Sequence, residues 1–554
     1  MLFLHLSLLA WNILLIYADP DSRFPPTVTS GHTKIIGYRN STTNIDFFGG
    51  IPFASPPVGD LRFRPPVLKT SFPSNVTTFS AMSFGQSCLQ LVDIPFKKLS
   101  STLSEDCLTV NIFRPTGASA ESKLPVMAYG GGFHDGESRA FDASTLVARS
   151  VSRGTPIVYV SFNYRLGPFG FPQGNEVSVT GDVNLGIKDL LAALKWVQAN
   201  IKAFGGDPTK VTVFGQSAGA IINSIIFLNS QISGLARAAI FASGSPATPA
   251  AHTAPQREAL WEKFVAGVPS CASVSTSGST LACMKEAPAL ELMLSYEQIG
   301  EDGWAPVVDG DVFPATPSIV YAQGNFSSIP FIAGDVLDEG TTFVAQVPGM
   351  NYSSEFIKAS ITALYSPPLS GVTTEELSDK IDELLALYPD DPAVGSPYNT
   401  GNETFGLDSG WKRAASITGD LLFQSSRRMW LQAAASRGSK VYSYLLTQPQ
   451  LGDPSLGVDH PTTQHYFYGD LLNDGVASDA TLSLAIMDYF LSFASSLDPN
   501  DGKGTVRPVW EQWSTSNKVM LQLNGGENQT VMINDDFRSE GIDAIISNPL
   551  VLYH

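Results

Sequence analysis

Residues 211–220 carry the side chain best suited to nucleophilic chemistry in this chain. They read Val-Thr-Val-Phe-Gly-Gln-Ser-Ala-Gly-Ala, so a short β-branched and aromatic run leads into Gly215-x-Ser217-x-Gly219, and an apolar, helix-compatible segment follows. A serine on so tight a strand-to-helix turn needs glycine on either side, because larger side chains would collide there. The pattern predicts a nucleophile elbow that exposes the Ser217 hydroxyl.

A serine nucleophile at neutral pH needs a base to take its proton, and the histidines can be eliminated one at a time. After an elbow serine, the acid and then the histidine follow along the chain. Histidines that precede the acid, or lie in the N-terminal leader or at the last residue, are His5, His32, His134, His252 and His554. The two candidates that remain are His460 and His465, both in the segment after a predicted strand at 441–446.

The acid that would orient this base is expected after another strand, predicted at 330–333. Asp335, Asp338 and Glu339 all lie there, where loops at the carboxyl edge of a parallel sheet carry catalytic groups. Composition alone does not choose among the three carboxyls.

The oxyanion of an ester reaction needs main-chain donors as well. Consecutive glycines follow a predicted strand at 124–129, and glycine lets the backbone come close to a substrate. The expected donors are the amides of Gly131, Gly132 and Ala218.

A sheet flanked by helices is needed to position these groups. Apolar residues recur at three- and four-residue steps over 186–204, which predicts an amphipathic helix that ends at the following Gly-Gly-Asp-Pro. Helix, Gly/Pro turn, strand, elbow and helix in succession form a βαβ rhythm, so we expect an α/β fold with a large, mostly parallel sheet. Further strands are expected at 156–162 and 236–241, helical or loop excursions at 253–303 and 350–418, a helix at 482–493, and peripheral packing at 506–513.

Composition and charge limit the classes of function. Of 554 residues, 43% are hydrophobic and 16% charged, a globular composition, and the formal net charge is −18. So acidic a surface repels phosphate backbones and anionic membranes, which excludes nucleic acid as a partner.

Residues 1–18 are expected to be a signal peptide, because an apolar run over 2–17 closes at Ala18 and is short for a membrane span. The run lacks Lys and Arg after Met1, so a signal anchor is the alternative. No later stretch is long and apolar enough to predict stable membrane insertion. We expect residues 19–554 to form a single domain.

Secretion favours paired cysteines and glycosylation. Local pairing, the simplest of the three connectivities, would join Cys88 to Cys107 and Cys271 to Cys283. Asn-x-Ser/Thr acceptor sites occur at Asn40, Asn75, Asn325, Asn351, Asn402 and Asn528.

Over nearly the whole mature chain, the sequence resembles the type-B carboxylesterase and lipase family, which includes cholinesterases and fungal lipases and has the α/β-hydrolase fold. The motifs that carry the resemblance occur in order: Gly50-Ile-Pro-Phe-Ala, Leu61-Arg-Phe, Glu105-Asp-Cys-Leu-Thr-Val-Asn, Gly130-Gly-Gly-Phe, Phe162-Asn-Tyr-Arg-Leu-Gly, Phe204-Gly-Gly-Asp-Pro, Phe214-Gly-Gln-Ser-Ala-Gly-Ala and Asp338-Glu-Gly-Thr.

The resemblance implies a role for each member of a triad: Ser217 as nucleophile, Glu339 as acid and His460 as base. It also implies both local disulfides and a pairing of Arg62 with Glu105. Two positions depart from the family's pattern: Gln216 stands where the family usually has glutamate, and Thr463 where an acidic residue often follows the histidine.

The sequence thus predicts a secreted serine hydrolase of small-molecule or lipid esters that needs no metal or organic cofactor. The alternatives are a lipase or sterol-ester hydrolase with a lid, and a non-catalytic binding ectodomain on the same scaffold. The loop 89–106 is short for a mobile lid, and its only aromatic, Phe96, lies beside Lys97 and Lys98. We therefore expect little interfacial activation and no preference for choline esters, unless another excursion serves as the lid.

Overall fold

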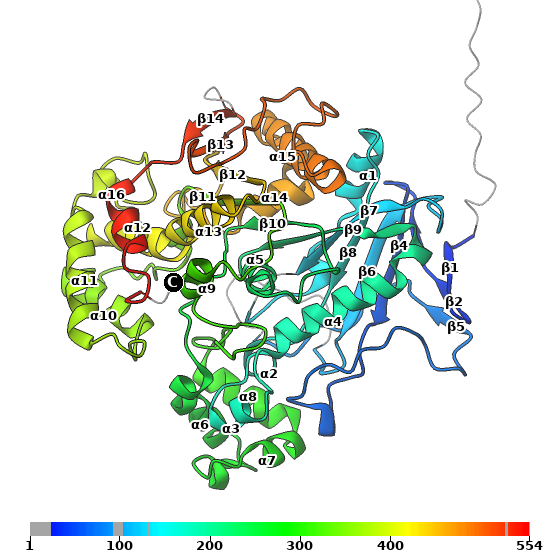
Figure 1. Ribbon diagram of the computed structural model, residues 1–554, viewed down its shortest axis with the longest axis horizontal. Helices are drawn as coiled ribbons and strands as arrows, with labels where there is room; N and C mark the ends of the chain where they lie inside the picture. Colours follow the sequence, from blue (N-terminus) through cyan, green and yellow to red (C-terminus); the bar gives the residue numbers. More distant parts are fainter. Residues whose placement is uncertain (1–23, 92–102, 131–132, 527–529, 553–554) are drawn as a thin grey trace, which may run out of the picture.

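The computed structural model describes residues 24–91, 103–130, 133–526 and 530–552. Within these residues, eleven strands form one sheet in the order β14-β13-β12-β11-β10-β9-β7-β8-β6-β4-β3, and β1, β2 and β5 form a small second sheet (Figure 1). The strands are β1 Thr27–Ser30, β2 Thr33–Ile36, β3 Tyr38–Asn40, β4 Ile45–Pro52, β5 Thr78–Ser80, β6 Thr109–Pro115, β7 Leu124–Gly130, β8 Val158–Phe162, β9 Gly206–Gln216, β10 Ala238–Ala242, β11 Phe331–Val336, β12 Val441–Leu446, β13 Val519–Leu523 and β14 Val531–Asn534.

The centre of the large sheet is parallel, as predicted. All pairings from β8 through β7, β9, β10, β11 and β12 to β13 are parallel, whereas β6, β4 and β3 at one edge and β14 at the other pair antiparallel. The carboxyl ends of β9, β11 and β12 therefore meet at one edge of the sheet, where the Gly-rich loop after β7 also begins.

Helices cover both faces of this sheet (Figure 1). Val211 and Val213 of β9 pack into a core shared with helices α4, α5 and α13, while Phe214 points to the opposite face and its ring lies 4.3 Å from that of Phe467 on α14. The helices are α1 Ser144–Ser152, α2 Gly167–Gly170, α3 Asn175–Val179, α4 Leu185–Asn200, α5 Ala218–Ile225, α6 Glu258–Ala266, α7 Leu281–Glu286, α8 Ala289–Ile299, α9 Pro317–Gln323, α10 Ser354–Leu364, α11 Thr374–Leu387, α12 Gly410–Gly419, α13 Ser425–Ser436, α14 Thr462–Tyr468, α15 Ala477–Ser496 and α16 Ser539–Ile546.

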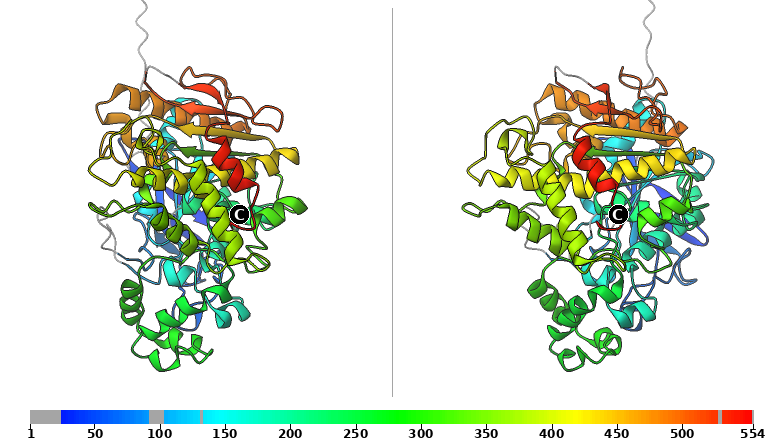
Figure 2. Two further views of the ribbon diagram at one scale, coloured as in Figure 1. Left: turned by 90° about the vertical axis from the view of Figure 1, so that its left-hand side faces the viewer. Right: turned by 60° about the vertical axis from the view of Figure 1, so that its left-hand side comes forward.

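The two predicted excursions are helical. Helices α6 to α8 protrude from one end of the molecule in every view, and α10 to α12 lie together near α16, at the left of Figure 1 (Figures 1 and 2). None of the helices within the described residues is long and apolar enough to cross a membrane.

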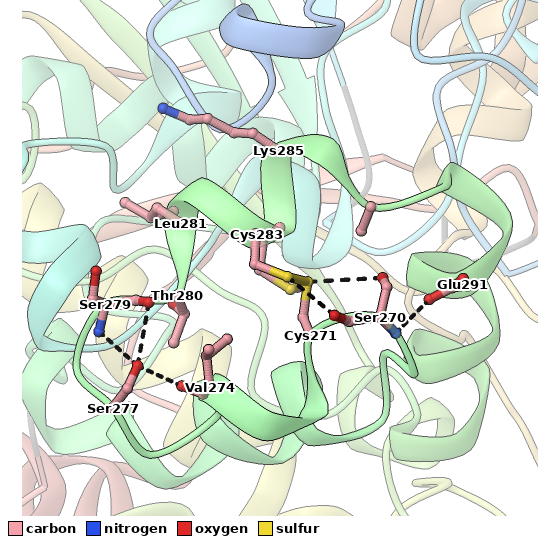
Figure 3. The surroundings of a disulfide bond; sticks show 12 residues. Ser270, Cys271, Val274, Ser277, Ser279, Thr280, Leu281, Cys283, Lys285 and Glu291 are labelled. Atoms are coloured by element: carbon pink, nitrogen blue, oxygen red, sulfur yellow. Dashed lines mark hydrogen bonds between the residues drawn. A yellow bond between two sulfur atoms is a disulfide. The ribbon is translucent and has the colours of Figure 1, made fainter.

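Both cysteine pairs form disulfides, Cys88–Cys107 and Cys271–Cys283. Figure 3 shows the second bridge, which ties the loop before a short 3-10 turn at Ala272–Val274 to α7. Next to it, the main-chain N–H of Ser270 donates to Glu291 on α8 at 2.9 Å. The bridge and this hydrogen bond hold the end of the protruding helical cluster together.

Two details differ from expectation. Strand β9 begins at Gly206 rather than at residue 211. The register between β7 and β9 shifts between Leu124 and Val126, and this irregular start accommodates Pro208, which has no main-chain N–H to donate. The segment 506–513 is peripheral only in part: Val506 and Val509 are exposed, whereas Trp510 and Trp513 are 1% and 2% exposed. The Trp510 indole donates to the main-chain oxygen of Ser443 on β12.

Several expectations fall outside the described residues: the signal peptide 1–18, part of the loop 89–106 with Phe96, Lys97 and Lys98, the donors Gly131 and Gly132, and the acceptor site Asn528. Of the other acceptor sites, Asn75, Asn325, Asn351 and Asn402 are exposed and Asn40 is partly buried.

Candidate active site

The turn between β9 and α5 has the geometry of a nucleophile elbow. Ser217 adopts φ 56° and ψ −129°, a conformation that non-glycine residues rarely take, and its main-chain N–H donates to Ala242 at 2.9 Å. A Cβ added to Gly215 would lie 2.3 Å from the main chain of Gly219, so this approach of strand and helix requires glycine. The elbow leaves the serine side chain partly exposed between buried neighbours.

One of the two candidate histidines reaches this serine. The Nε2 of His460 lies 2.7 Å from the Ser217 Oγ, and His460 is 6% exposed. His465 lies on α14, five residues after His460; it is half exposed and contacts Asp470 at 3.1 Å. The structure therefore brings His460, and not His465, to the serine.

Three carboxyls were left open by the sequence, and each has a different partner in the structure. Glu339 Oε2 lies 2.5 Å from His460 Nδ1, and its Oε1 accepts the main-chain N–H of Val336 at 2.9 Å. Asp335 on β11 is bound by Arg427 at 3.0 Å. Asp338 accepts hydrogen bonds from the main-chain N–H groups of Val458 and Tyr398 and from the Ser396 hydroxyl, so it holds loops instead of the imidazole.

Hydrogen-bond chemistry assigns the protons in this chain of groups. An ionised carboxylate only accepts, so the Nδ1 of His460 carries the proton that faces Glu339. The Nε2 is then unprotonated and accepts the hydroxyl proton of Ser217. This is the tautomer that a general base needs.

The electrostatics of the neighbouring carboxyls follow from their partners. Burial raises the pKa of Asp335 to about 7 against the opposing effect of Arg427, and burial also raises the pKa of Asp338. At Asp535 burial acts in the same direction, but the guanidinium groups of Arg427 and Arg428 outweigh it and hold the pKa of this carboxyl well below its usual range. A buried, ion-paired network thus lies directly beside Glu339.

Two phenylalanines hold the imidazole ring, and sequence reasoning did not identify them. The rings of Phe343 and Phe423 lie 4.9 and 4.8 Å from that of His460. Phe423 belongs to a π-helix, Asp420–Gln424, between α12 and α13, and such irregular turns are frequent at functional sites. No local sequence pattern predicts a π-helix. Phe343 could have been found, because it lies just after the Asp338-Glu-Gly-Thr motif.

The two departures from the family's pattern also flank His460. Gln216, the last residue of β9, is 5% exposed, and its side-chain amide donates to the main-chain oxygen of His460 at 2.9 Å. Thr463, in the first turn of α14, is fully buried. Neither position presents a carboxylate to the imidazole.

Of the three expected oxyanion donors, the structure describes only Ala218, because Gly131 and Gly132 lie outside the described residues. Gly130, the last residue of β7, pairs with Gly215 of β9, so the Gly-rich loop begins two residues from Ser217 in the neighbouring strand. Ala218 is the first residue of α5, where helix amides have no acceptor within the helix. Among the residues described, no group of three or more His, Cys, Asp or Glu side chains is placed to hold a metal ion.

The Arg62–Glu105 pair that the resemblance implies is confirmed. The guanidinium contacts both carboxylate oxygens, at 2.6 and 2.8 Å, and donates to three main-chain oxygens around α7. It joins the N-terminal segment to the α6–α8 excursion, away from the serine's partners.

Comparison with known proteins places this fold in a family. The carboxylesterase family model matches residues 25–539. A secreted triacylglycerol lipase of Gibberella zeae is 34% identical, covering 94% of this chain and 90% of the relative, and lipase 1 of Geotrichum candidum is 34% identical over 94% of each chain. The crystal structure of Aspergillus niger EstA superposes with a TM-score of 0.81 at 27% identity, covering 96% of this chain and all of that one, and a PNB esterase with a TM-score of 0.73 at 26% identity, covering 94% and 99%.

The family match extends over nearly the whole chain, and the solved relatives share the α/β-hydrolase arrangement of sheet and helices. The expectation of a carboxylic ester hydrolase is therefore confirmed, and the chain belongs to the carboxylesterase family.

Proposed function

We propose that this carboxylic ester hydrolase works through a Ser217–His460–Glu339 triad and an acyl-enzyme intermediate. The Ser217 oxygen attacks the ester carbonyl while His460 Nε2 takes its proton. Glu339 holds the imidazole and stabilises the imidazolium that forms. The amides of Gly131, Gly132 and Ala218 donate to the developing oxyanion.

The second half of the reaction uses the same groups. The leaving alkoxide takes the proton from His460, and the acyl group stays on Ser217 as an ester. Water then attacks this ester, again giving a proton to His460, and the serine leaves with that proton as the carboxylic acid is released. These steps balance without any metal or organic cofactor.

A single observation carries this proposal: the hydrogen-bonded chain from Ser217 Oγ through His460 to Glu339, with links of 2.7 and 2.5 Å. Its three members come from three separate segments of the sheet's carboxyl edge. Binding scaffolds on this fold have no need for such an alignment, so it favours an enzyme over a non-catalytic ectodomain.

We also propose that the protein is secreted and glycosylated, as a single domain over 19–554. The predicted leader, the two disulfides and the relatives that are named secreted lipases support secretion. The exposed acceptor sites Asn75, Asn325, Asn351 and Asn402 are the expected places for glycans.

Turnover of a short chromogenic ester tests the proposed triad. Wild type should release the chromophore with a stoichiometric burst, whereas Ser217→Ala and His460→Ala should each lose several orders of magnitude in kcat. His465→Ala is the matched control, because this histidine is half exposed and far from the serine's hydrogen bonds, and its rate should stay at the wild-type value. A larger loss in His465→Ala than in His460→Ala would overturn the assignment of the base.

Water-insoluble esters are the second candidate substrate class, because several relatives are named lipases. The short loop 89–106 nevertheless favours an esterase without a lid. Measuring the rate while a short-chain triacylglycerol is taken through its solubility limit separates the two. We expect a smooth saturation curve, and a jump in rate as the emulsion forms would establish the lipase instead. Efficient turnover of choline esters would contradict the expected absence of that preference.

A further inference from the structure

The main chain at His460 lies in a long segment without regular structure, residues 447–461 between β12 and α14. A base on such a loop needs its backbone fixed, because about 1 Å of misplacement can cost on the order of a hundredfold in rate. The imidazole is held by its own ring contacts, but these fix only the end of the side chain.

Several side chains bind the backbone of this loop. Thr341 donates its hydroxyl to the main-chain oxygen of Leu456 at 2.7 Å, and two others act next to His460. Asp338 accepts the N–H of Val458 at 2.9 Å and donates its own main-chain N–H to the oxygen of Val458 at 3.0 Å, which ties the base loop to the acid loop. Gln216 ties it to the nucleophile, because its amide donates to the oxygen of His460 itself at 2.9 Å. Gln216 is covalently next to Ser217, so this is the shortest connection between the two reacting residues apart from the serine–imidazole contact.

The chemistry of this contact depends on the amide. A main-chain oxygen only accepts, so the group that faces it must be the NH2 of Gln216. An amide keeps this donor at every pH at which the protein is folded. A carboxylate at the same position has no proton to donate and would repel the oxygen.

We propose that Gln216 is a positioning residue for the base: its amide fixes the main chain of His460 relative to Ser217 through a hydrogen bond that does not titrate. The proposal rests on the proposed triad. It adds a requirement for a donor, at a position where the family usually has glutamate.

Two substitutions test the donor. Gln216→Met has a similar shape and no donor, and we expect kcat to fall by about tenfold while KM stays within about threefold, because the base is displaced and the substrate surface is not. At low pH the kcat of Gln216→Glu should equal or exceed that of Gln216→Met, because the new carboxyl is protonated there and can donate. Its rate relative to wild type should then fall as the pH rises.

The charges around this position support that pH response. Glu339 and Asp338 stand at the start of the turn after β11, Asp335 lies on β11 with Arg427 of α13 as its ion-pair partner, and His460 lies opposite. The carboxylate of Glu339, on the far side of the His460 imidazole, disfavours a second carboxylate in the buried space. The introduced carboxyl is therefore expected to hold its proton to a higher pH than an exposed glutamate.

Gln198→Met is the matched control. Gln198 on α4 donates its amide to the main-chain oxygens of Pro208 and Leu235, both at 2.9 Å, at the opposite end of β9 from the elbow. Loss of the Gln198 amide should lower the melting temperature without changing kcat. A kcat loss equal to that of Gln216→Met would mean that the effect comes from loosening the sheet.

The proposal is overturned if Gln216→Met keeps the wild-type kcat, or if this variant changes only KM or the melting temperature. It is also overturned if the kcat of Gln216→Glu, divided by that of wild type, does not change with pH. Stoichiometric labelling by a fluorophosphonate separates this failure from failure of the triad. Slowed labelling of Ser217 in Gln216→Met supports the positioning role. If wild type takes no label at Ser217, the proposed function itself fails.

Discussion

Two buried carboxyls four residues apart, Asp335 and Glu339, have opposite electrostatic surroundings. Asp335 contacts Arg427, a permanent cation that also binds Asp535 through both its terminal nitrogens. Glu339 contacts the imidazole of His460, a group that takes up and releases a proton in the proposed mechanism. Both carboxyls are 1% exposed, so burial does not distinguish them.

The difference teaches what each carboxyl is for. At Asp335 the opposite charge is always present and opposes the rise in pKa that burial causes, so the interaction belongs to the folded state and holds it in register. In the proposed mechanism the opposite charge at Glu339 appears only when His460 takes the serine proton, so its electrostatic stabilisation is greatest in the transition state. We therefore expect substitutions at the two sites to separate activity from stability.

The largest expected effect is on activity, from Glu339→Gln. The new amide can donate to Nδ1, which moves the imidazole proton to Nε2 and leaves no acceptor for the Ser217 hydroxyl. We expect kcat to fall by about a thousandfold to ten-thousandfold, with a melting temperature within a few degrees of wild type. Kinetics with a short ester and thermal unfolding of the same samples provide both measurements.

Glu339→Asp is the control, because it keeps the charge and shortens the reach. It should retain more activity than Glu339→Gln. If the glutamine variant turns over at close to the wild-type rate, the comparison between the two carboxyls is wrong.

The next effect is on stability, from Arg427→Met. Removing this guanidinium leaves Asp335 and part of Asp535 buried without their cation, which we expect to cost about 3 to 5 kcal/mol of unfolding free energy. The activity of the protein that remains folded should stay within about tenfold of wild type. Lys358→Met removes an exposed pair with Asp382 and should change stability by less than about 1 kcal/mol.

The pH dependence of the Arg427→Met effect has a definite sign. Arg427 and Arg428 lower the pKa of Asp535, so this carboxyl stabilises the fold above its ordinary pKa, and the contribution is lost as the pH falls toward the lowered value. The stability difference between wild type and variant should thus be largest near neutrality and shrink in acid. Denaturant unfolding at a series of pH values measures it, and a difference that grows in acid would contradict the account.

The sequence was sufficient to predict the parallel sheet and the elbow, because both depend on local patterns. The strand expected at 441–446 has those bounds in β12, and the helix expected at 186–204 is α4 followed by a 3-10 turn that ends at Gly205. The buried positions of Trp510 and Trp513 were not predicted, because an irregular segment has no periodic pattern that reveals the partners it packs against.

At the candidate site, residue patterns narrowed the acid to three carboxyls and the base to two histidines. The choice of acid and base depends on which side chains the fold turns toward Ser217. From the sequence, only the family resemblance selected Glu339 and His460. Phe423 and the contact of Gln216 with His460 needed coordinates, because a π-helix and a side-chain bond to a main-chain oxygen across 244 positions leave no periodic signal.

The smallest expected effect concerns a second buried histidine, His252. His252 is 2% exposed and contacts the main-chain oxygen of Leu364; burial, with Arg257 nearby, lowers its pKa to about 4. The unfolded chain takes a proton at this position near pH 6.5, while the folded chain does not until about pH 4. Stability should therefore fall as the pH drops through this window, by about 2 to 3 kcal/mol.

His252→Asn should flatten that part of the stability curve, because asparagine does not titrate and can still donate to Leu364. Urea unfolding of both proteins between pH 7 and pH 4 makes the comparison. Equal slopes would show that burial does not control the protonation of this histidine.

The location of a covalent label tests the central claim most directly. After reaction with a fluorophosphonate, peptide mass spectrometry should find one adduct per chain, on the Ser217 hydroxyl, and activity should fall in proportion to the label. Ser217→Ala should take up none while unfolding at the wild-type temperature. An adduct on another residue that accounts for the lost activity, or persistent labelling of Ser217→Ala, would contradict the account.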